Sequence, residues 1–266
     1  MERLYINQIK DHLDTEIKLQ GFVENFRNGK AMAFIVLKDI TGKVQITIEK
    51  EQHPELEEVL AQITPDSVIT VYGTAVASEY VKMGGMEVFP TQIILESAAD
   101  ALPIIREGIP ATKKKAAVER SAIDSRLDYR WIDLRTERNQ LIFKAQTVLT
   151  KALRDFLLER NFLEIHTPKL IGAASESGSD VFAVKYFDTT AYLAQSPQFY
   201  KQMAMASGFE RIFEVGPVFR AEKSYTSKHT TEFTGFDLEF SYITSFRDVM
   251  KMEEELLTYA LGKVKE

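Results

Sequence analysis

The chain has 266 residues, of which 45% are hydrophobic and 27% are charged, a composition typical of a folded globular protein. It contains no cysteine, which excludes disulfides, thiolate metal ligands and a cysteine nucleophile. The first residues lack the pattern of a signal peptide, and no apolar run reaches the roughly 18 residues of a membrane helix. We therefore expect a cytoplasmic protein of two ordinary domains, with no membrane partner.

The charge is divided unevenly along the chain. Residues 1–100 carry 9 Lys or Arg and 16 Asp or Glu, a net charge of −7, whereas residues 101–266 carry 24 and 23, a net charge of +1. An acidic N-terminal part argues against a broad nucleic-acid-binding surface. If this part binds RNA, it must do so through a local patch.

Residues 17–95 have the pattern of short strands separated by turns. Three strands come first, and Asn-Gly and Thr-Gly pairs between them are hairpin signals. A helix follows in HPELEEVLAQI, and then two more strands flank a Gly-Gly turn. This order predicts an OB-fold, the five-stranded barrel often used for single-stranded nucleic acid. A five-stranded barrel of another kind is the alternative.

The rest of the chain predicts a linker and a second domain. Residues 101–125 read as a linker, whose run Lys113-Lys114-Lys115 we interpret as a solvated hinge, with contact to an RNA backbone as the alternative. A long amphipathic helix is predicted over 138–160. Strands and helices then alternate without a βαβ rhythm, which predicts an α+β domain on an antiparallel sheet over 126–266.

Three segments of this second domain resemble, in the right order, the class II aminoacyl-tRNA synthetases of the aspartyl/asparaginyl/lysyl subclass. LDYRWIDLR is similar to the segment before motif 1, NFLEIHTPKL to the end of motif 1, and VFRAEKSYTSKHTTEFTGFDLEF to motif 2. That subclass also carries an N-terminal OB-fold. The resemblance covers nearly the whole chain and implies an anticodon-binding barrel over 1–100 followed by the N-terminal part of a class II catalytic domain. Motif 1, which ends at Pro168, implies a homodimer.

The resemblance implies an ATP site in motif 2. Arg220 matches the arginine of the α-phosphate, Glu222 the acid that faces the adenine amino group, and Phe233 the phenylalanine that stacks on adenine. Lys228 and His229 lie in the loop that contacts the γ-phosphate, where lysine departs from the usual arginine and loses its bidentate fork. Catalytic roles fall on Arg220, Glu222 and His229. A preorganised cation such as Arg220 stabilises the charge that develops on the α-phosphate oxygens in the transition state. The simpler alternatives are that Arg220 and Glu222 form a surface ion pair, that Phe233 lies in the core and that His229 is solvated.

The resemblance also implies an aspartate site. Lys201 matches the lysine that binds the side-chain carboxylate in aspartyl enzymes, and Gln198 matches a glutamine hydrogen-bonded to the substrate. Glu176 and Ser179 match a loop that closes over the amino acid, and Asp237 matches the aspartyl enzymes in motif 2. A neutral amide would leave Lys201 partly unpaired, which disfavours asparagine. An exposed helical lysine is the alternative for Lys201.

On the barrel, the resemblance assigns an anticodon site. Phe34 and Gln45 match residues that stack on and hydrogen-bond to the central anticodon uridine, and Arg27 and Asn28 belong to the same surface. One base stacked on an aromatic ring contributes about 1–3 kcal/mol, which is enough for local binding by an acidic domain. A place in the barrel core is the alternative for Phe34.

The activity that the resemblance implies is activation of L-aspartate by ATP and Mg²⁺ and its transfer to tRNA(Asp). Motif 3, with the arginine of the γ-phosphate and the Mg²⁺-binding acids, has no counterpart in these residues, so we expect no metal ligands here and a fragment that is inactive alone. The alternatives are an asparaginyl-tRNA synthetase, an asparagine-forming ligase, which would lack the barrel, and a non-catalytic tRNA-binding paralog. The sequence leaves open whether tRNA(Asn) is also charged.

Overall fold

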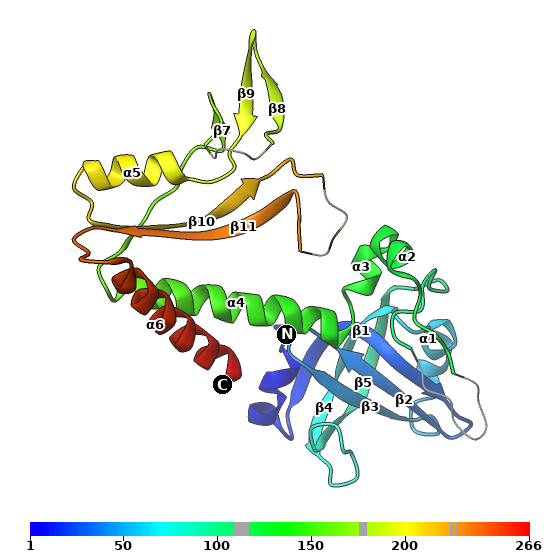
Figure 1. Ribbon diagram of the computed structural model, residues 1–266. Coiled ribbons are helices and arrows are strands. Elements are labelled where there is room, and N and C mark those ends of the chain that lie inside the picture. The colour runs from blue at the N-terminus through cyan, green and yellow to red at the C-terminus, as the bar shows by residue number, and fades with distance from the viewer. Residues whose placement is uncertain (109–116, 176–179, 224–225, 227) are drawn as a thin grey trace. The chain divides into compact units, whose positions relative to one another are not determined.

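The computed structural model describes residues 1–108, 117–175, 180–223, 226 and 228–266 (Figure 1). It divides into two compact units, Met1–Ile105 and Arg106–Glu266. The run Lys113-Lys114-Lys115 lies outside the described residues. Within the described ranges, no helix is both long and apolar enough to cross a membrane.

The first unit is a closed barrel with the strand order β1-β2-β3-β5-β4. Its strands are β1 (Glu16–Asn28), β2 (Met32–Lys38), β3 (Lys43–Glu49), β4 (Val68–Ala77) and β5 (Met86–Ser97). Its helices are η1 (Ile6–His12), η2 (Pro54–Leu56) and α1 (Glu57–Gln62). Parallel pairing of β3 with β5 closes the barrel, while the other pairs are antiparallel. Three strands, a helix and two strands confirm the predicted OB-fold.

Alternation along the strands decides what fills the barrel. In β2, the side chains of Ala33, Ile35 and Leu37 are fully buried in the core, and the residues between them are half-buried on the outer side. This is the period of two expected for a strand with one face against a core. Phe34 therefore belongs to the outer side, and the alternative that placed it in the barrel core is wrong.

The second unit contains two small sheets and five helices among its described residues. One sheet has the order β11-β10-β6, from β6 (Leu163–Glu164), β10 (Arg211–Phe219) and β11 (Glu232–Phe240). The other has the order β7-β9-β8, from β7 (Leu170–Ile171), β8 (Ala183–Tyr186) and β9 (Thr189–Leu193). The helices are α2 (Ile123–Asp128), α3 (Arg130–Asp133), α4 (Glu137–Leu158), α5 (Gln198–Ala206) and α6 (Phe246–Lys265). This is the predicted mixture of helices with an antiparallel hairpin.

Helices cover both faces of the β10–β11 hairpin. Figure 1 shows α4 and α6 on one side of the hairpin and α5 on the other. The core on the α4 and α6 side is built from aromatic and aliphatic side chains, among them Phe156, Leu157, Phe213, Leu256 and Ala260. The apolar layer of α4 and α6 thus packs against one face of the hairpin. The opposite face, toward α5, is left to carry polar side chains.

A buried carboxylate fixes the start of α4. The Asp133 side chain is fully buried and lies 3.0, 3.5 and 2.7 Å from nitrogens of Arg120, Arg126 and Arg130. Asn139, in the first turn of α4, also donates to it at 3.0 Å. Burial alone would raise the pKa of Asp133, but Arg120 and Arg126 outweigh burial and hold that pKa below its ordinary value. The segment LDYRWIDLR therefore anchors the long helix.

Candidate active site

The face of the β10–β11 hairpin that α5 covers carries four cross-strand pairs, and we call it the site face. The pairs are Ile212 with Glu239, Glu214 with Asp237, Gly216 with Gly235, and Val218 with Phe233. Residues directly opposite in an antiparallel pair point to the same side of the sheet. The intervening residues, such as Phe213 and Leu238, pack toward α4 and α6. The site face is therefore a row with a different chemistry at each end.

One end of the row holds Lys201 of α5. The side chain is buried, and its Nζ lies 3.2 Å from Asp237 Oδ1 and 3.4 Å from Glu239 Oε2. A buried ammonium group is tolerated because it is paired. The alternative of an exposed helical lysine is wrong. Gln198 begins α5 and is half-buried, with its backbone N–H donating to Ser196 Oγ.

The other end of the row holds Arg220 and Phe233. Arg220 follows β10, its backbone N–H donates to the Thr231 carbonyl at 3.0 Å, and its guanidinium carbon lies 5.6 Å from the centroid of the Phe233 ring. Within the described residues, the buried Nε of Arg220 has no hydrogen-bond partner. Phe233 is 39% exposed. An unpaired guanidinium N–H beside an open aromatic face is an arrangement that fits a phosphate and a stacked base.

The rest of motif 2 lies closer to solvent. Glu222 is half-buried just beyond Arg220, and Lys228 and His229 are exposed. The Nδ1 of His229 lies 2.7 Å from Thr226 Oγ1, which holds the ring within its own loop. Both side chains can therefore be reached from solvent.

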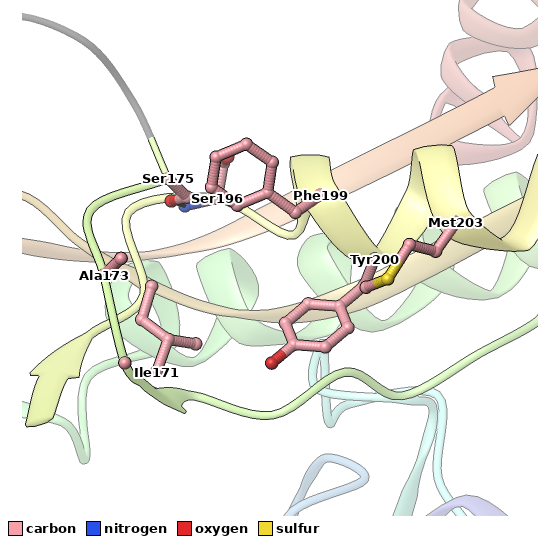
Figure 2. A pocket seen from close by; sticks show the side chains of 8 residues that line it. Ile171, Ala173, Ser175, Ser196, Phe199, Tyr200 and Met203 are labelled. Carbon is pink, nitrogen blue, oxygen red and sulfur yellow. Dashed lines mark hydrogen bonds between the residues drawn. The ribbon is translucent and has the colours of Figure 1, made fainter.

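The loop that carries Glu176 and Ser179 lies outside the described residues. Ser175, the residue before it, is held by hydrogen bonds. Ser175 donates its backbone N–H to Oε1 of the fully buried Gln195 at 3.1 Å, and Ser175 Oγ accepts from the Ser196 N–H at 3.3 Å. Figure 2 shows Ser175 and Ser196 in the wall of a pocket of about 210 Å³ against α5. The pocket is lined by Ile171, Gly172, Ala173, Ser175, Ser196, Phe199, Tyr200 and Met203. Sequence reasoning missed Gln195, although a polar residue before the Ser-Pro pair was a visible signal.

A second buried ion pair, also missed, lies in the middle of the site face. Glu214 is 3% exposed and accepts hydrogen bonds from Thr167 N at 2.8 Å, Thr167 Oγ1 at 2.7 Å and Lys169 Nζ at 2.8 Å. Burial alone would raise the pKa of Glu214, but these hydrogen bonds hold that pKa below its ordinary value. Pro168 is exposed between Thr167 and Lys169. Alternation along β10 was the available signal, because it puts Glu214 on the same face as Arg220.

The outer surface of the barrel brings the anticodon candidates near one another. Phe34 is half-buried and is the cross-strand neighbour of Arg27 on β1 and of Thr47 on β3. Gln45 lies two residues before Thr47 on the same side of β3, and its Nε2 donates to Thr47 Oγ1 at 3.0 Å. Arg27 and Asn28 are exposed at the end of β1. The ring of Phe34, the guanidinium group of Arg27 and the amide of Gln45 thus share one side of the barrel, whereas Asn28 pairs with the core-facing Ala33 at the end of the strand.

Among the described residues, no group of three or more His, Cys, Asp or Glu could hold a metal ion. The described side chains of the site face include both cations and carboxylates. Arg220 and Phe233 fit a nucleotide at one end, and Lys201 with Asp237 fits a zwitterion with a second carboxylate at the other. The glycine pair lies between the two ends and adds no side chains of its own.

Comparison with known proteins agrees with both units. Residues 122–266 match the family model described as tRNA synthetases class II (D, K and N), and residues 17–96 match the OB-fold nucleic acid binding domain. The chain is 46% identical over 94% of its length to the Aspartate--tRNA(Asp/Asn) ligase of Methanopyrus kandleri, of which it covers 56%. It is 41% identical over 97% of its length to the Aspartate--tRNA(Asp) ligase of Picrophilus torridus, of which it covers 59%. The chain thus spans a little more than half the length of these curated relatives.

Two solved structures share the fold. An asparaginyl-tRNA synthetase from Pyrococcus horikoshii, complexed with asparaginyl-adenylate, superposes with a TM-score of 0.88 at 31% identity, over 99% of this chain and 58% of that one. An aspartyl tRNA synthetase from Entamoeba histolytica superposes with a TM-score of 0.79 at 29% identity, over 98% of this chain and 54% of that one. Because the family model covers more than half of its residues, the chain belongs to the class II tRNA synthetases of the D, K and N group.

Proposed function

We propose that this chain carries the anticodon-binding barrel and the aspartate- and ATP-binding hairpin of an enzyme that activates L-aspartate and transfers it to tRNA(Asp). The observation that carries the proposal is the buried Lys201, held by Asp237 and Glu239 on the face that also presents Arg220. The curated relatives named above are aspartate ligases, which supports the same substrate.

In the proposed activation step, an oxygen of the aspartate α-carboxylate attacks the α-phosphorus of ATP. The new acyl–phosphate bond forms as the bond to the β-phosphate bridge breaks, and pyrophosphate leaves with the electron pair. Arg220 donates to the α-phosphate oxygens, where negative charge grows in the transition state. Phe233 stacks on adenine, and Glu222 accepts from the adenine amino group.

The γ-phosphate is the proposed ligand of Lys228 and His229, which are exposed beside the site face. Mg²⁺, when bound, would neutralise charge on the triphosphate. Among the residues that the structure describes, no group of three or more His, Cys, Asp or Glu could hold this ion.

Aspartate is selected by charge. Lys201 binds the β-carboxylate, Asp237 takes the α-ammonium group, and Gln198 hydrogen-bonds to the substrate, while Glu176 and Ser179 belong to the loop that closes over it. Asparagine would put a neutral amide at Lys201 and lose a charge-assisted hydrogen bond. The asparaginyl alternative is disfavoured for this reason.

The barrel is the proposed site of the anticodon. Phe34 stacks on the central uridine, Gln45 hydrogen-bonds to its edge, and Arg27 and Asn28 contact the neighbouring backbone. A local site of this kind suits a barrel whose overall charge is negative.

A second copy of the chain is the proposed partner of α4. Leu141, Ile142 and Phe143 in its first half are 63%, 58% and 50% exposed, whereas Phe156 and Leu157 in its second half are buried. Exposed apolar side chains of this size mark an interaction surface. A homodimer that continues through Pro168 would cover them, in the cytoplasm where the substrates occur.

The test is pyrophosphate exchange by the full-length product of the gene, with L-aspartate and with L-asparagine. We expect exchange that depends on aspartate and ATP, and charging of tRNA(Asp). Exchange that asparagine supports and aspartate does not would reject the aspartate assignment. A folded, tRNA-binding protein without exchange would favour a non-catalytic paralog.

A further inference from the structure

Lys169 lies directly over Gly216 of the site face. A Cβ added to Gly216 would lie 3.3 Å from Lys169 Cε and 3.4 Å from Lys169 Nζ. The backbone carbonyl of Lys169 accepts from the Ala194 N–H at 2.9 Å, which fixes the residue beside β9 and β10. The ammonium group therefore occupies the space above a glycine and not a distant part of the surface.

The glycine pair lies between the two ends of the site. Gly235 comes two residues after Phe233 and two before Asp237, and Gly216 is its partner on β10. Two residues of a strand span about 7 Å, a distance comparable to the length of an aspartate molecule. An aspartyl group held at Lys201 and joined to a nucleotide at Arg220 must cross this pair. The atoms that cross it are those of the α-carboxylate.

The hydrogen bonds of Lys169 leave it able to bind a further group. An ammonium group has three N–H donors. In the described structure, Lys169 Nζ donates to Thr167 Oγ1 at 3.0 Å and to Glu214 Oε1 at 2.8 Å. The Lys169 side chain is 22% exposed, so a ligand can reach it, while the buried carboxylate of Glu214 balances its charge.

We propose that Lys169 is a second cation of the aspartate site, which holds the α-carboxylate beside Gly216 while Lys201 holds the β-carboxylate. This inference rests on the proposed function. The two ammonium groups then recognise the two acidic ends of a dicarboxylate. During activation one α-carboxylate oxygen bonds to phosphorus and pyrophosphate leaves, while Lys169 keeps its proton and its hydrogen bond to the other oxygen.

The first test compares three variants of the full-length product: Lys169→Met, Lys169→Met with Glu214→Gln, and Lys185→Met. Lys169→Met alone would leave the buried Glu214 carboxylate without its cation and could unfold the protein. The double variant therefore removes both charges. In pyrophosphate exchange, the double variant should raise the aspartate KM roughly tenfold to hundredfold, as loss of a charged hydrogen bond does, with the ATP KM unchanged. Lys185 is exposed on β8, so Lys185→Met should match the wild type.

The second test measures competitive inhibition by the α-amide of L-aspartate, which keeps the β-carboxylate and lacks the α-carboxylate charge. The wild type should bind aspartate far more tightly than this amide, and the double variant should bind the two about equally. A purely structural role for Lys169 would leave this ratio unchanged. A wild-type aspartate KM and ratio in a folded double variant would overturn the inference, whereas a wild type without aspartate-dependent exchange would overturn the proposed function instead.

Discussion

Lys201 Nζ lies 3.2 Å from Asp237 Oδ1, although 36 residues separate the two along the chain. One belongs to α5 and the other to β11, so the pair joins the helix to the site face. The same ammonium reaches Glu239 at 3.4 Å. In the proposed function, the carboxylate of a zwitterion binds Lys201 and its ammonium group pairs with one of the two carboxylates.

Lys201→Met in the full-length product should weaken aspartate binding. Loss of the charged contact predicts a rise of roughly tenfold to hundredfold in the aspartate KM, with ATP binding nearly intact. The measurement is aspartate-dependent pyrophosphate exchange. Gln202→Met, at the exposed neighbour on α5, is the matched control. An unchanged aspartate KM in the Lys201 variant would remove this residue from the site.

The second unit should lose stability in acid through Glu214. Its folded pKa lies below the ordinary 4.5, so its contribution is complete above that value and is lost as the pH falls through the folded pKa. Glu214→Gln should therefore be less stable than the wild type at pH 7, and the difference should shrink below pH 4.5. Urea unfolding across this range measures it. A constant difference at all pH values would contradict the assigned ion pair.

Asp133→Asn should destabilise the second unit strongly. Three arginines lose their shared buried carboxylate, and a broken buried ion pair costs about 3 kcal/mol, at the low end of the usual range because the guanidinium groups are partly exposed. Urea unfolding should show this loss, while Asp128→Asn, at an exposed position of α2, should not change the midpoint. Equal midpoints for the two variants would show that the cluster does not anchor α4.

Phe34→Ala should weaken RNA binding without unfolding the barrel. Loss of one base stack predicts about 1–3 kcal/mol weaker binding to an anticodon stem-loop with a central uridine. Tyr80 is 97% exposed, so Tyr80→Ala is a control for the loss of an aromatic surface residue. Salt-dependent binding titrations and thermal melts separate the two roles. Unchanged binding would exclude Phe34 from the RNA surface.

A polypeptide of residues 1–266 alone should give only background pyrophosphate exchange. Arg220 and His229 supply part of the charge that the triphosphate needs, and removing one such contact typically lowers the rate by about 10²–10³. The full-length Methanopyrus kandleri relative serves as the positive control. Robust exchange from a homogeneous preparation of these residues would show that the site is complete without motif 3.

The sequence predicts the barrel well, because hairpin signals and a period of two are local properties of the chain. The match to motif 2 also puts Arg220 and Phe233 on one hairpin, where the structure has them side by side, whereas the prediction of Lys201 rests on a separate match on α5. Lys169 and Gln195 escape such reasoning, since their partners Glu214 and Ser175 lie 45 and 20 residues away. Only the fold shows that those side chains meet.

Side chains alternate along β10 and β11, so the site face and the apolar core lie on opposite faces of the same two strands. A shift of one residue in a strand exchanges its two faces. Deletion of one residue early in β11 would turn Asp237 and Glu239 into the apolar layer of α4 and α6, and would bring Phe236 and Leu238 under Lys201. The hairpin therefore tolerates substitutions far better than changes of length. The register of its two strands determines which side chains face α5 and the proposed substrate.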